Sequence, residues 1–159
     1  MKILIIYYSK TNNTKKLAAE IAKGVEAAGA TAILKDTAEV SRDDFRAAAG
    51  VIAGSPVYFG VMAAQLKKVF DDMVGLRREM ENKVGAAFAT GNHHSGGKET
   101  TMLSILQCMM IYGMIIVGDP MTASGHYGVA CCGKPDDSAA ADGFKLGERV
   151  AKLCAKLTE

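Results

Sequence analysis

The sequence has no strong excess of charge of either sign. Its 159 residues include 19 lysines and arginines and 17 aspartates and glutamates, which gives a formal net charge of +2. These charges are spread along the chain rather than gathered in a stripe, so nucleic acid is not an expected partner. A strongly acidic surface, which a small protein would need in order to dock on basic partners, is absent as well.

Long apolar runs and closely spaced cysteine motifs are also lacking. No segment approaches the roughly 20 apolar residues that cross a membrane, so neither a membrane span nor a membrane partner is expected. The four cysteines are Cys108, Cys131, Cys132 and Cys154, and none forms a CxxC motif. We therefore expect reduced thiols in a cytoplasmic protein, with neither disulfides nor a metal site. Cys131 and Cys132 are interpreted as small apolar residues at the end of a strand.

The length and the order of the apolar segments indicate a single α/β domain over residues 1–159. Short apolar runs that suit buried parallel strands alternate with segments whose apolar residues recur at helical spacing. The expected strands cover residues 2–8, 31–35, 51–54, 84–90 and 114–117, and Pro56 should end the third. The expected helices cover residues 14–28, 62–73, 99–112 and 142–157, with a short helix capped by Ser41. This alternation predicts a doubly wound, three-layer, five-stranded parallel sheet.

The loop between the first expected strand and the first expected helix is rich in hydroxyl and amide groups. It reads Ser9, Lys10, Thr11, Asn12, Asn13 and Thr14. The free N–H groups and the positive dipole end of the following helix, with lysines nearby, make this loop a candidate phosphate site. A simpler interpretation is that Asn12 or Asn13 only caps the helix and the lysines form a solvated face.

Two further loops stand at the expected carboxyl ends of strands, where open parallel sheets bind their ligands. One contains Pro56, Val57, Tyr58, Phe59 and Gly60, and the other contains Thr90, Gly91, Asn92, His93, His94, Ser95, Gly96 and Gly97. The aromatic rings suit a flat ligand, and the glycines allow backbone amides to approach it. A phosphate site beside these loops predicts a mononucleotide with a planar heterocycle, and FMN fits best.

Four segments of the chain resemble the flavodoxin-like superfamily, and within it the tryptophan-repressor-binding-protein branch of FMN-dependent NAD(P)H:quinone oxidoreductases. They are YYSKTNNT, GSPVYFG, ATGNHHSGGKETT and YGMIIVG, in this order. The resemblance implies the sheet order 2-1-3-4-5, FMN as cofactor and NAD(P)H as reductant. It implies a cofactor site formed by Ser9, Thr11, Asn12, Asn13, Thr14, Pro56, Val57, Tyr58, Phe59, Gly60, Thr90, Gly91, Asn92, His93, Gly96 and Gly97.

Two positions depart from that family pattern. Asn13 stands where many flavodoxins have glycine, a replacement that is tolerated because asparagine can adopt left-handed conformations. Tyr112 stands where the quinone-reducing branch has a histidine that helps to line the substrate site. The stretch between the second and third strands is also shorter than in that branch.

Other doubly wound proteins do not match the strand ends of this chain. A receiver domain needs an aspartate at the end of the third strand, where this chain has Ser55 and Pro56. A low-molecular-weight phosphatase needs a cysteine and an arginine in its first loop, and a P-loop nucleotidase needs a Gly-Lys-Ser/Thr signature. The first loop, residues 9–14, contains neither cysteine nor arginine, and no Gly-Lys-Ser/Thr signature occurs in the sequence.

The expected function is an FMN-dependent oxidoreductase that accepts hydride from NAD(P)H and reduces a quinone-like small molecule. The alternative is a flavodoxin that carries single electrons between redox proteins, and a binding module without redox chemistry is a third class. Residues 9–14, 56–60 and 90–98 contain no acid, whereas Lys98 and two histidines add positive charge, which favours hydride acceptance. No catalytic side chain is expected because the flavin performs the chemistry, and His93 and His94 are interpreted as solvated loop residues.

The helix expected at residues 99–112 predicts a homo-oligomer, either a dimer or a tetramer. Its apolar residues cover more of the helix circumference than a single sheet-facing stripe requires. They are Met102, Leu103, Ile105, Leu106, Met109, Met110 and Ile111. The surplus apolar surface needs a cover, and a second copy of the chain would supply it. The alternative is a helix that is deeply buried within a monomer.

Overall fold

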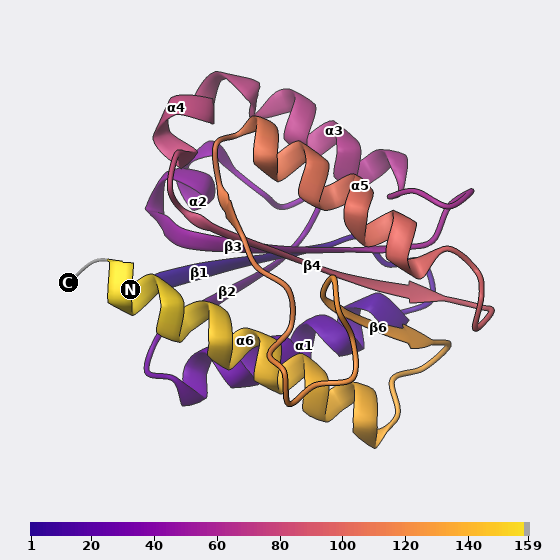
Figure 1. The fold of residues 1–159 in the computed structure, drawn as a ribbon. Helices are drawn as coiled ribbons and strands as arrows, with labels where there is room; N and C mark the ends of the chain where they lie inside the picture. The colour runs from indigo at the N-terminus through magenta and orange to yellow at the C-terminus, as the bar shows by residue number, and fades with distance from the viewer. Residues whose placement is uncertain (158–159) are drawn as a thin grey trace.

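Short apolar strands, buried on both faces, form the centre of the molecule. The computed structural model describes residues 1–157, and in it all strand pairs are parallel (Figure 1). The first strands are β1 (Lys2–Tyr7), β2 (Thr31–Asp36), β3 (Ala48–Pro56) and β4 (Val84–Gly91). The strand order β2-β1-β3-β4-β5 confirms the predicted order. The carboxyl ends of β1, β3 and β4 therefore lie next to one another at one edge of the sheet.

The predicted count of five strands is wrong, because the fifth strand position is interrupted. β5 (Ile115–Ile116) pairs with Val84 and Gly85 at the start of β4, whereas β6 (Val129–Cys132) pairs with residues 88–91 at its end. Within residues 1–157 the sheet thus has six strands, and residues 117–128 form a loop between the two half-strands. Glycines and Pro120 in this loop are unsuited to a continuous strand. Cys131 and Cys132 end β6, as their interpretation required.

Helices cover both faces of the sheet (Figure 1). α1 (Asn13–Ala27) and α6 (Asp137–Leu157) pack on one face, where their apolar stripes meet Ile3, Ile5 and Phe88. The other face is covered by α2 (Arg42–Ala47), α3 (Ala64–Asp72), the single turn η1 (Val74–Leu76), α4 (Arg77–Met80) and α5 (Lys98–Ile111). The sequence predicted neither η1 nor α4, and α6 begins five residues before the predicted Asp142. No helix within residues 1–157 is long and apolar enough to span a bilayer.

The third strand ends at Pro56, as the sequence predicted, although it covers Ala48–Pro56 rather than residues 51–54 alone. The backbone of Val57 bonds toward β4, since its N–H donates to the carbonyl of Thr90 at 2.8 Å. The nitrogen of Pro56 therefore faces the β1 side, but β1 has already ended at Tyr7, opposite Gly54. The missing N–H of proline thus costs no strand hydrogen bond.

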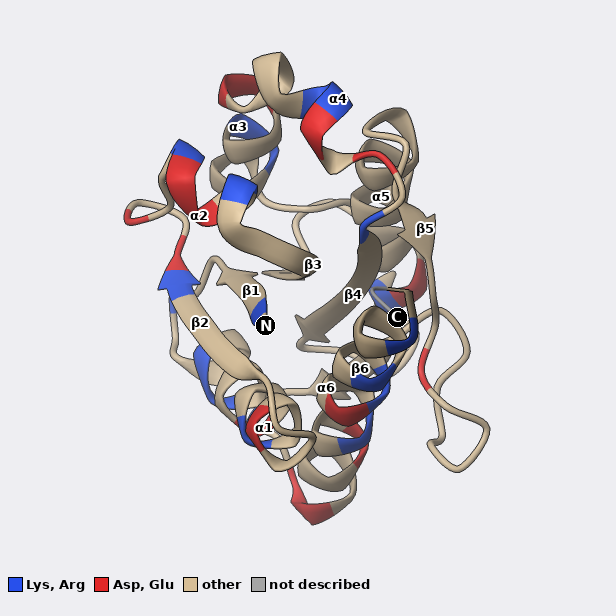
Figure 2. Ribbon diagram, turned by 90° about the vertical axis from the view of Figure 1, so that its left-hand side faces the viewer, with Lys and Arg blue, Asp and Glu red and all other residues tan. Residues whose placement is uncertain are grey.

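α1 and α6 cross in direct backbone contact. A Cβ atom on Gly147 would lie 2.0 Å from the carbonyl oxygen of Ile21, and one on Gly24 would lie 1.9 Å from that of Phe144. Both distances are far below van der Waals contact, so only glycine fits at either position. Lysines, arginines and acids are mixed along the outer helices (Figure 2), in agreement with the balanced composition.

Candidate functional site

The three predicted loops meet at the carboxyl ends of β1, β3 and β4. They enclose a cavity of about 250 Å³, called here the strand-end cavity. Its lining consists of Lys10, Thr11, Asn13, Thr14, Pro56, Val57, Tyr58, Thr90, Gly91 and Asn92. All of these except Lys10 belong to the predicted site. The predicted residues that do not line the cavity are Ser9, Asn12, Phe59, Gly60, His93, Gly96 and Gly97.

Thr90 joins the three loops. Its hydroxyl lies 2.8 Å from the hydroxyl of Thr14, and both side chains are buried. Its carbonyl accepts the N–H of Val57. The first turn of α1 and the loop after β3 are therefore both fixed to the end of β4.

The amino end of α1 is the part of the cavity best suited to an anion. Asn12 is the N-cap residue, with a left-handed φ of 65°, but its side chain makes no capping hydrogen bond. The simpler interpretation of Asn12 as the side-chain cap is therefore not supported. Asn13 is already helical, so the residue that adopts the left-handed conformation is Asn12 rather than Asn13. Within residues 1–157, the only hydrogen bond from a backbone N–H of this turn to a side chain is long, from the N–H of Lys15 to the Oγ of Ser9 at 3.4 Å.

The loop after β3 ends in a tight turn that directs Phe59 away from the cavity. The N–H and carbonyl groups of Tyr58 and Val61 bond each other at 3.0 and 3.1 Å, and Phe59 and Gly60 between them have φ values of 50° and 79°. The Phe59 side chain is fully exposed. A left-handed phenylalanine costs about 1 to 2 kcal/mol, so the two hydrogen bonds must hold the turn.

The aromatic neighbour of Tyr58 is instead Tyr8. The two ring centroids lie 6.3 Å apart. Tyr8 was predicted only as part of the first strand, although its position at the carboxyl end of that strand indicated that it could lie at the site.

The loop after β4 is held by Lys98, a residue outside the predicted site. Its ammonium donates to the carbonyls of His93 and His94 at 2.9 and 2.6 Å, and its side chain is buried. The stem of Lys98 packs against Gly91, where a Cβ would lie 3.1 Å from the lysine Cγ. The side chains of His93 and His94 are exposed. An indicator in the sequence was a lysine at the start of a helix, where the dipole disfavours positive charge.

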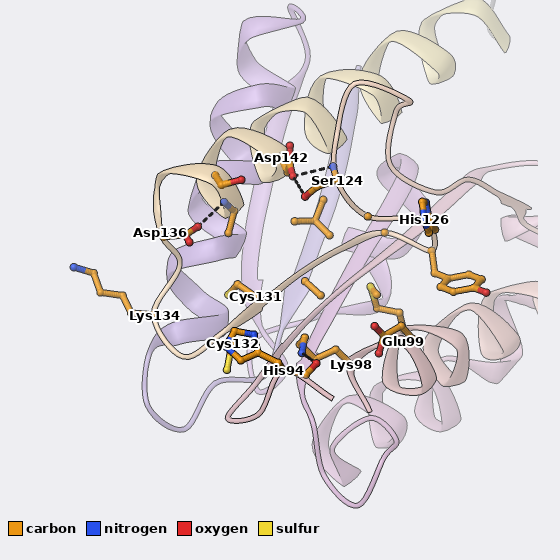
Figure 3. A pocket seen from close by; sticks show the side chains of 18 residues that line it. His94, Lys98, Glu99, Ser124, His126, Cys131, Cys132, Lys134, Asp136 and Asp142 are labelled. Atoms are coloured by element: carbon orange, nitrogen blue, oxygen red, sulfur yellow. Dashed lines mark hydrogen bonds between the residues drawn. The ribbon is translucent and has the colours of Figure 1, made fainter. Parts of the chain in front are cut away.

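A second cavity, of about 400 Å³, lies beside the free edge of β6 (Figure 3) and is called here the edge cavity. It is enclosed by residues 124–128, by the start of α6, and by His94 and Lys98. Within residues 1–157, hydrogen bonds between three residue pairs hold the loop 117–128 against α6. They are Ser124 to Asp142 at 2.5 Å, Lys145 to the carbonyl of Thr122 at 2.8 Å, and Arg149 to the carbonyl of Asp119 at 2.5 Å.

The pKa values of two groups in the wall of the edge cavity, the Asp142 carboxyl and the Cys131 thiol, are shifted away from neutral pH. Burial would raise the pKa of Asp142, but hydrogen bonds from Ser124 and Lys145 keep this pKa below its ordinary value. Burial raises the pKa of the Cys131 thiol to about 11. At neutral pH the carboxyl is therefore ionised and the thiol is protonated, so Cys131 is not a nucleophile.

Tyr112 lies far from both cavities along α5. It directly follows that helix, whereas Lys98 begins it. Its ring packs against Phe45 and Phe70, and its hydroxyl donates to the carbonyl of Phe70. Burial raises the pKa of Tyr112 to about 12. Tyr112 therefore lines neither of the two cavities.

Comparison with known proteins agrees with this arrangement. Residues 31–128 match the family model of NADPH-dependent FMN reductases. Over 189 aligned positions the chain is 35% identical to an NAD(P)H dehydrogenase (quinone) of Archaeoglobus fulgidus, and the match covers 98% of each protein. The chain belongs to the NADPH-dependent FMN reductase family.

Proteins named flavodoxin are also among the relatives of this FMN reductase family member. A flavodoxin of Aquifex aeolicus is 33% identical over 163 positions, which cover 97% of this chain and 87% of the relative. Among solved structures, a flavodoxin from the domain Archaea superposes with a TM-score of 0.83 at 25% identity, covering 98% of this chain and 99% of the other. A WrbA-like flavodoxin from Agrobacterium tumefaciens has a TM-score of 0.85 at 21% identity, covers 98% of each chain and shows the shared fold.

Proposed function

We propose that this chain is an FMN-dependent oxidoreductase that accepts hydride from NAD(P)H and reduces a quinone-like small molecule. The observation that carries the proposal is the convergence of three strand-end loops on one cavity beside an uncapped helix terminus. The relatives named NAD(P)H dehydrogenase (quinone) support the reaction type. The flavodoxin relatives support the alternative, a one-electron carrier between redox proteins. We also propose that residues 1–159 act as a single domain.

The residues of the strand-end cavity fit FMN. The free N–H groups of α1 and the hydroxyls of Thr11 and Thr14 would hold its phosphate. Residues 56–58 and 90–92 would hold the sugar chain and the flat ring. FMN supplies the hydride-accepting chemistry, while the protein binds it, orients it and sets the charge around it. We therefore assign no catalytic side chain, and we keep Ser9, Asn12, Phe59, Gly60, His93, Gly96 and Gly97 as proposed contacts from the adjoining loop segments.

The charge around the cavity favours two-electron chemistry. Residues 9–14, 56–60 and 90–98 contain no acid, and the stem of the buried Lys98 packs against Gly91, which lines this cavity. Positive charge stabilises the anionic fully reduced flavin.

We expect NADH or NADPH to be oxidised with benzoquinone as acceptor by the FMN-loaded protein. We also expect stepwise dithionite reduction to show only the oxidised and fully reduced spectra. An additional long-wavelength spectrum at the midpoint, together with no nucleotide oxidation, would assign the chain to the carrier class.

The outer face of α5 supports the proposed homo-oligomer. Met102, Ile105, Leu106 and Met109 are buried beneath this helix, whereas Leu103, Met110 and Ile111 are exposed, Ile111 by 63%. Ile111 and the exposed Val74 line the same surface groove. A second copy would cover this apolar surface.

Light scattering of the unmodified protein at micromolar concentration should therefore give the mass of a dimer or tetramer. The double substitution Met110→Gln and Ile111→Gln should reduce this mass to that of a monomer, because it makes the exposed surface polar. Glu26→Gln, in α1 on the opposite face of the sheet, is the control and should leave the mass unchanged. A monomer mass for the unmodified protein would contradict the proposal.

A further inference from the structure

Lys98 carries a buried positive charge without an acidic partner. It is 8% exposed, and within residues 1–157 its ammonium donates two hydrogen bonds, to the neutral carbonyls of His93 and His94. An ammonium has three N–H donors, so one remains without an acceptor among residues 1–157. Lys98 is also the first residue of α5, where the helix dipole disfavours a cation. Buried charges are normally paired, so an anion is the missing partner.

The edge cavity, whose wall includes Lys98, has spare donors for such an anion. The side chains of His94, His126 and Lys134 lie along its lining (Figure 3) and make no hydrogen bond or ion pair within residues 1–157. Lys134 extends outward from the rim. An exposed aromatic residue, Tyr127, lies on the same lining.

The acids of the cavity are mostly engaged elsewhere. Asp136 accepts the N–H of Ala139 at 2.8 Å, and Asp142 accepts hydrogen bonds from Ser124 and Lys145. Glu99 is the acid on this lining that has no partner in the described chain. The balance of unpaired groups therefore favours a negatively charged ligand, with Glu99 opposing it.

The edge cavity adjoins the strand-end cavity. Gly91 and Asn92 line the strand-end cavity, whereas His94 and Lys98, from the same segment, line the edge cavity. Thr90 on β4 and Cys131 on β6 are register partners, one in each lining. A volume of about 400 Å³ is within the usual range for small-molecule sites.

We propose that the edge cavity binds the phosphorylated adenosine half of NAD(P)H while the nicotinamide reaches the strand-end cavity. This inference rests on the proposed function. Lys98 supplies the buried charge and Lys134, His94 and His126 supply the outer donors, so a ligand with an additional 2′-phosphate gains a further contact. NADPH is therefore preferred over NADH.

The test uses the triple variant His94→Gln, His126→Gln and Lys134→Gln, whose side chains are all exposed and unpaired. In the FMN-loaded protein, we expect the ratio of kcat/KM for NADPH to that for reduced nicotinamide mononucleotide to fall about tenfold. The mononucleotide lacks the adenosine half, so it reports losses that are unrelated to the edge cavity. Lys152→Gln, which removes a lysine paired with Glu148 elsewhere on α6, is the charge-matched control.

Binding is measured separately from activity. Adenosine 2′,5′-bisphosphate should bind by calorimetry to the protein with and without FMN, about tenfold more weakly in the triple variant and more tightly in Glu99→Gln. An unchanged ratio, or an affinity that is the same in the triple variant, would overturn the proposal. Equal competition by inorganic phosphate would show a simple anion site and would also overturn it. A failure of the proposed function can be distinguished from a failure of this inference, because only the former would appear as absent FMN binding in a flavin titration.

Discussion

Replacement of Thr11 and Thr14 together by alanine is expected to weaken FMN binding by about 1 to 3 kcal/mol, roughly five- to 150-fold in Kd. Both threonines line the strand-end cavity at the uncapped amino end of α1. Their hydroxyls would donate to a charged phosphate, and such hydrogen bonds are stronger than neutral ones. Loss of Thr14 also leaves the hydroxyl of Thr90 without its partner at 2.8 Å.

The measurement is quenching of flavin fluorescence during titration of FMN-free protein. The matched control is Thr11→Ser with Thr14→Ser, which keeps both hydroxyls and should retain most of the affinity. Far-ultraviolet circular dichroism establishes that each variant is folded. If the alanine variant bound FMN as tightly as the unmodified protein, the phosphate would lie elsewhere. If unmodified protein showed no saturable binding up to millimolar FMN, the proposed function itself would fail.

Gly147→Ala is expected to destabilise the fold by about 3 kcal/mol or more. The added methyl group would lie 2.0 Å from the carbonyl oxygen of Ile21 and 3.0 Å from the backbone nitrogen of Val25, so α1 and α6 must separate. Backbone atoms cannot rotate away as a side chain can. The greater helix propensity of alanine, about 1 kcal/mol, offsets only part of this cost.

Gly143→Ala, one turn earlier on α6, is the comparison. Its added Cβ would meet the Cδ1 atom of Leu17 at 3.0 Å, and the end of a leucine side chain can move. We expect Gly143→Ala to change the free energy of unfolding by less than about 1 kcal/mol, since propensity and crowding oppose each other. Urea unfolding of the FMN-free variants measures both values. Equal costs at the two positions would show that the backbone contact at Gly147 does not control the helix crossing.

The strands and helices that the sequence predicted are those with strong local signals. β1 is an unbroken apolar run, and α1 shows its buried residues at helical spacing. The cap predicted at Ser41 is confirmed, because its hydroxyl accepts the N–H of Asp44 and the Asp44 carboxylate accepts the N–H of Ser41. Each of these features depends on residues close together in the chain.

Features that depend on distant contacts were missed. β6 was not predicted, and its pairing with residues 88–91 is set by β4 rather than by its own pattern. The exposed position of Phe59 follows from the turn between Tyr58 and Val61, whose geometry the composition of the loop does not indicate. The role of Lys98 depends on the path of the segment before it, so the sequence identified its charge but not its hydrogen bonds.

Because the fifth strand is interrupted, the positions of β5 and β6 beside β4 do not depend on each other, as they would in a continuous strand. Each half-strand has its own pairing with β4, and the N–H of Gly133 donates to the carbonyl of Gly91 at 2.7 Å just beyond β6. The register of β6 beside the strand-end cavity is therefore independent of the number of residues between Ile116 and Val129. Insertions and deletions in this stretch would leave the residues of the strand-end cavity in place, because none of them lies between Ile116 and Val129. The same changes would reshape the wall of the edge cavity, which includes residues 124–128, so the two cavities can change independently of each other.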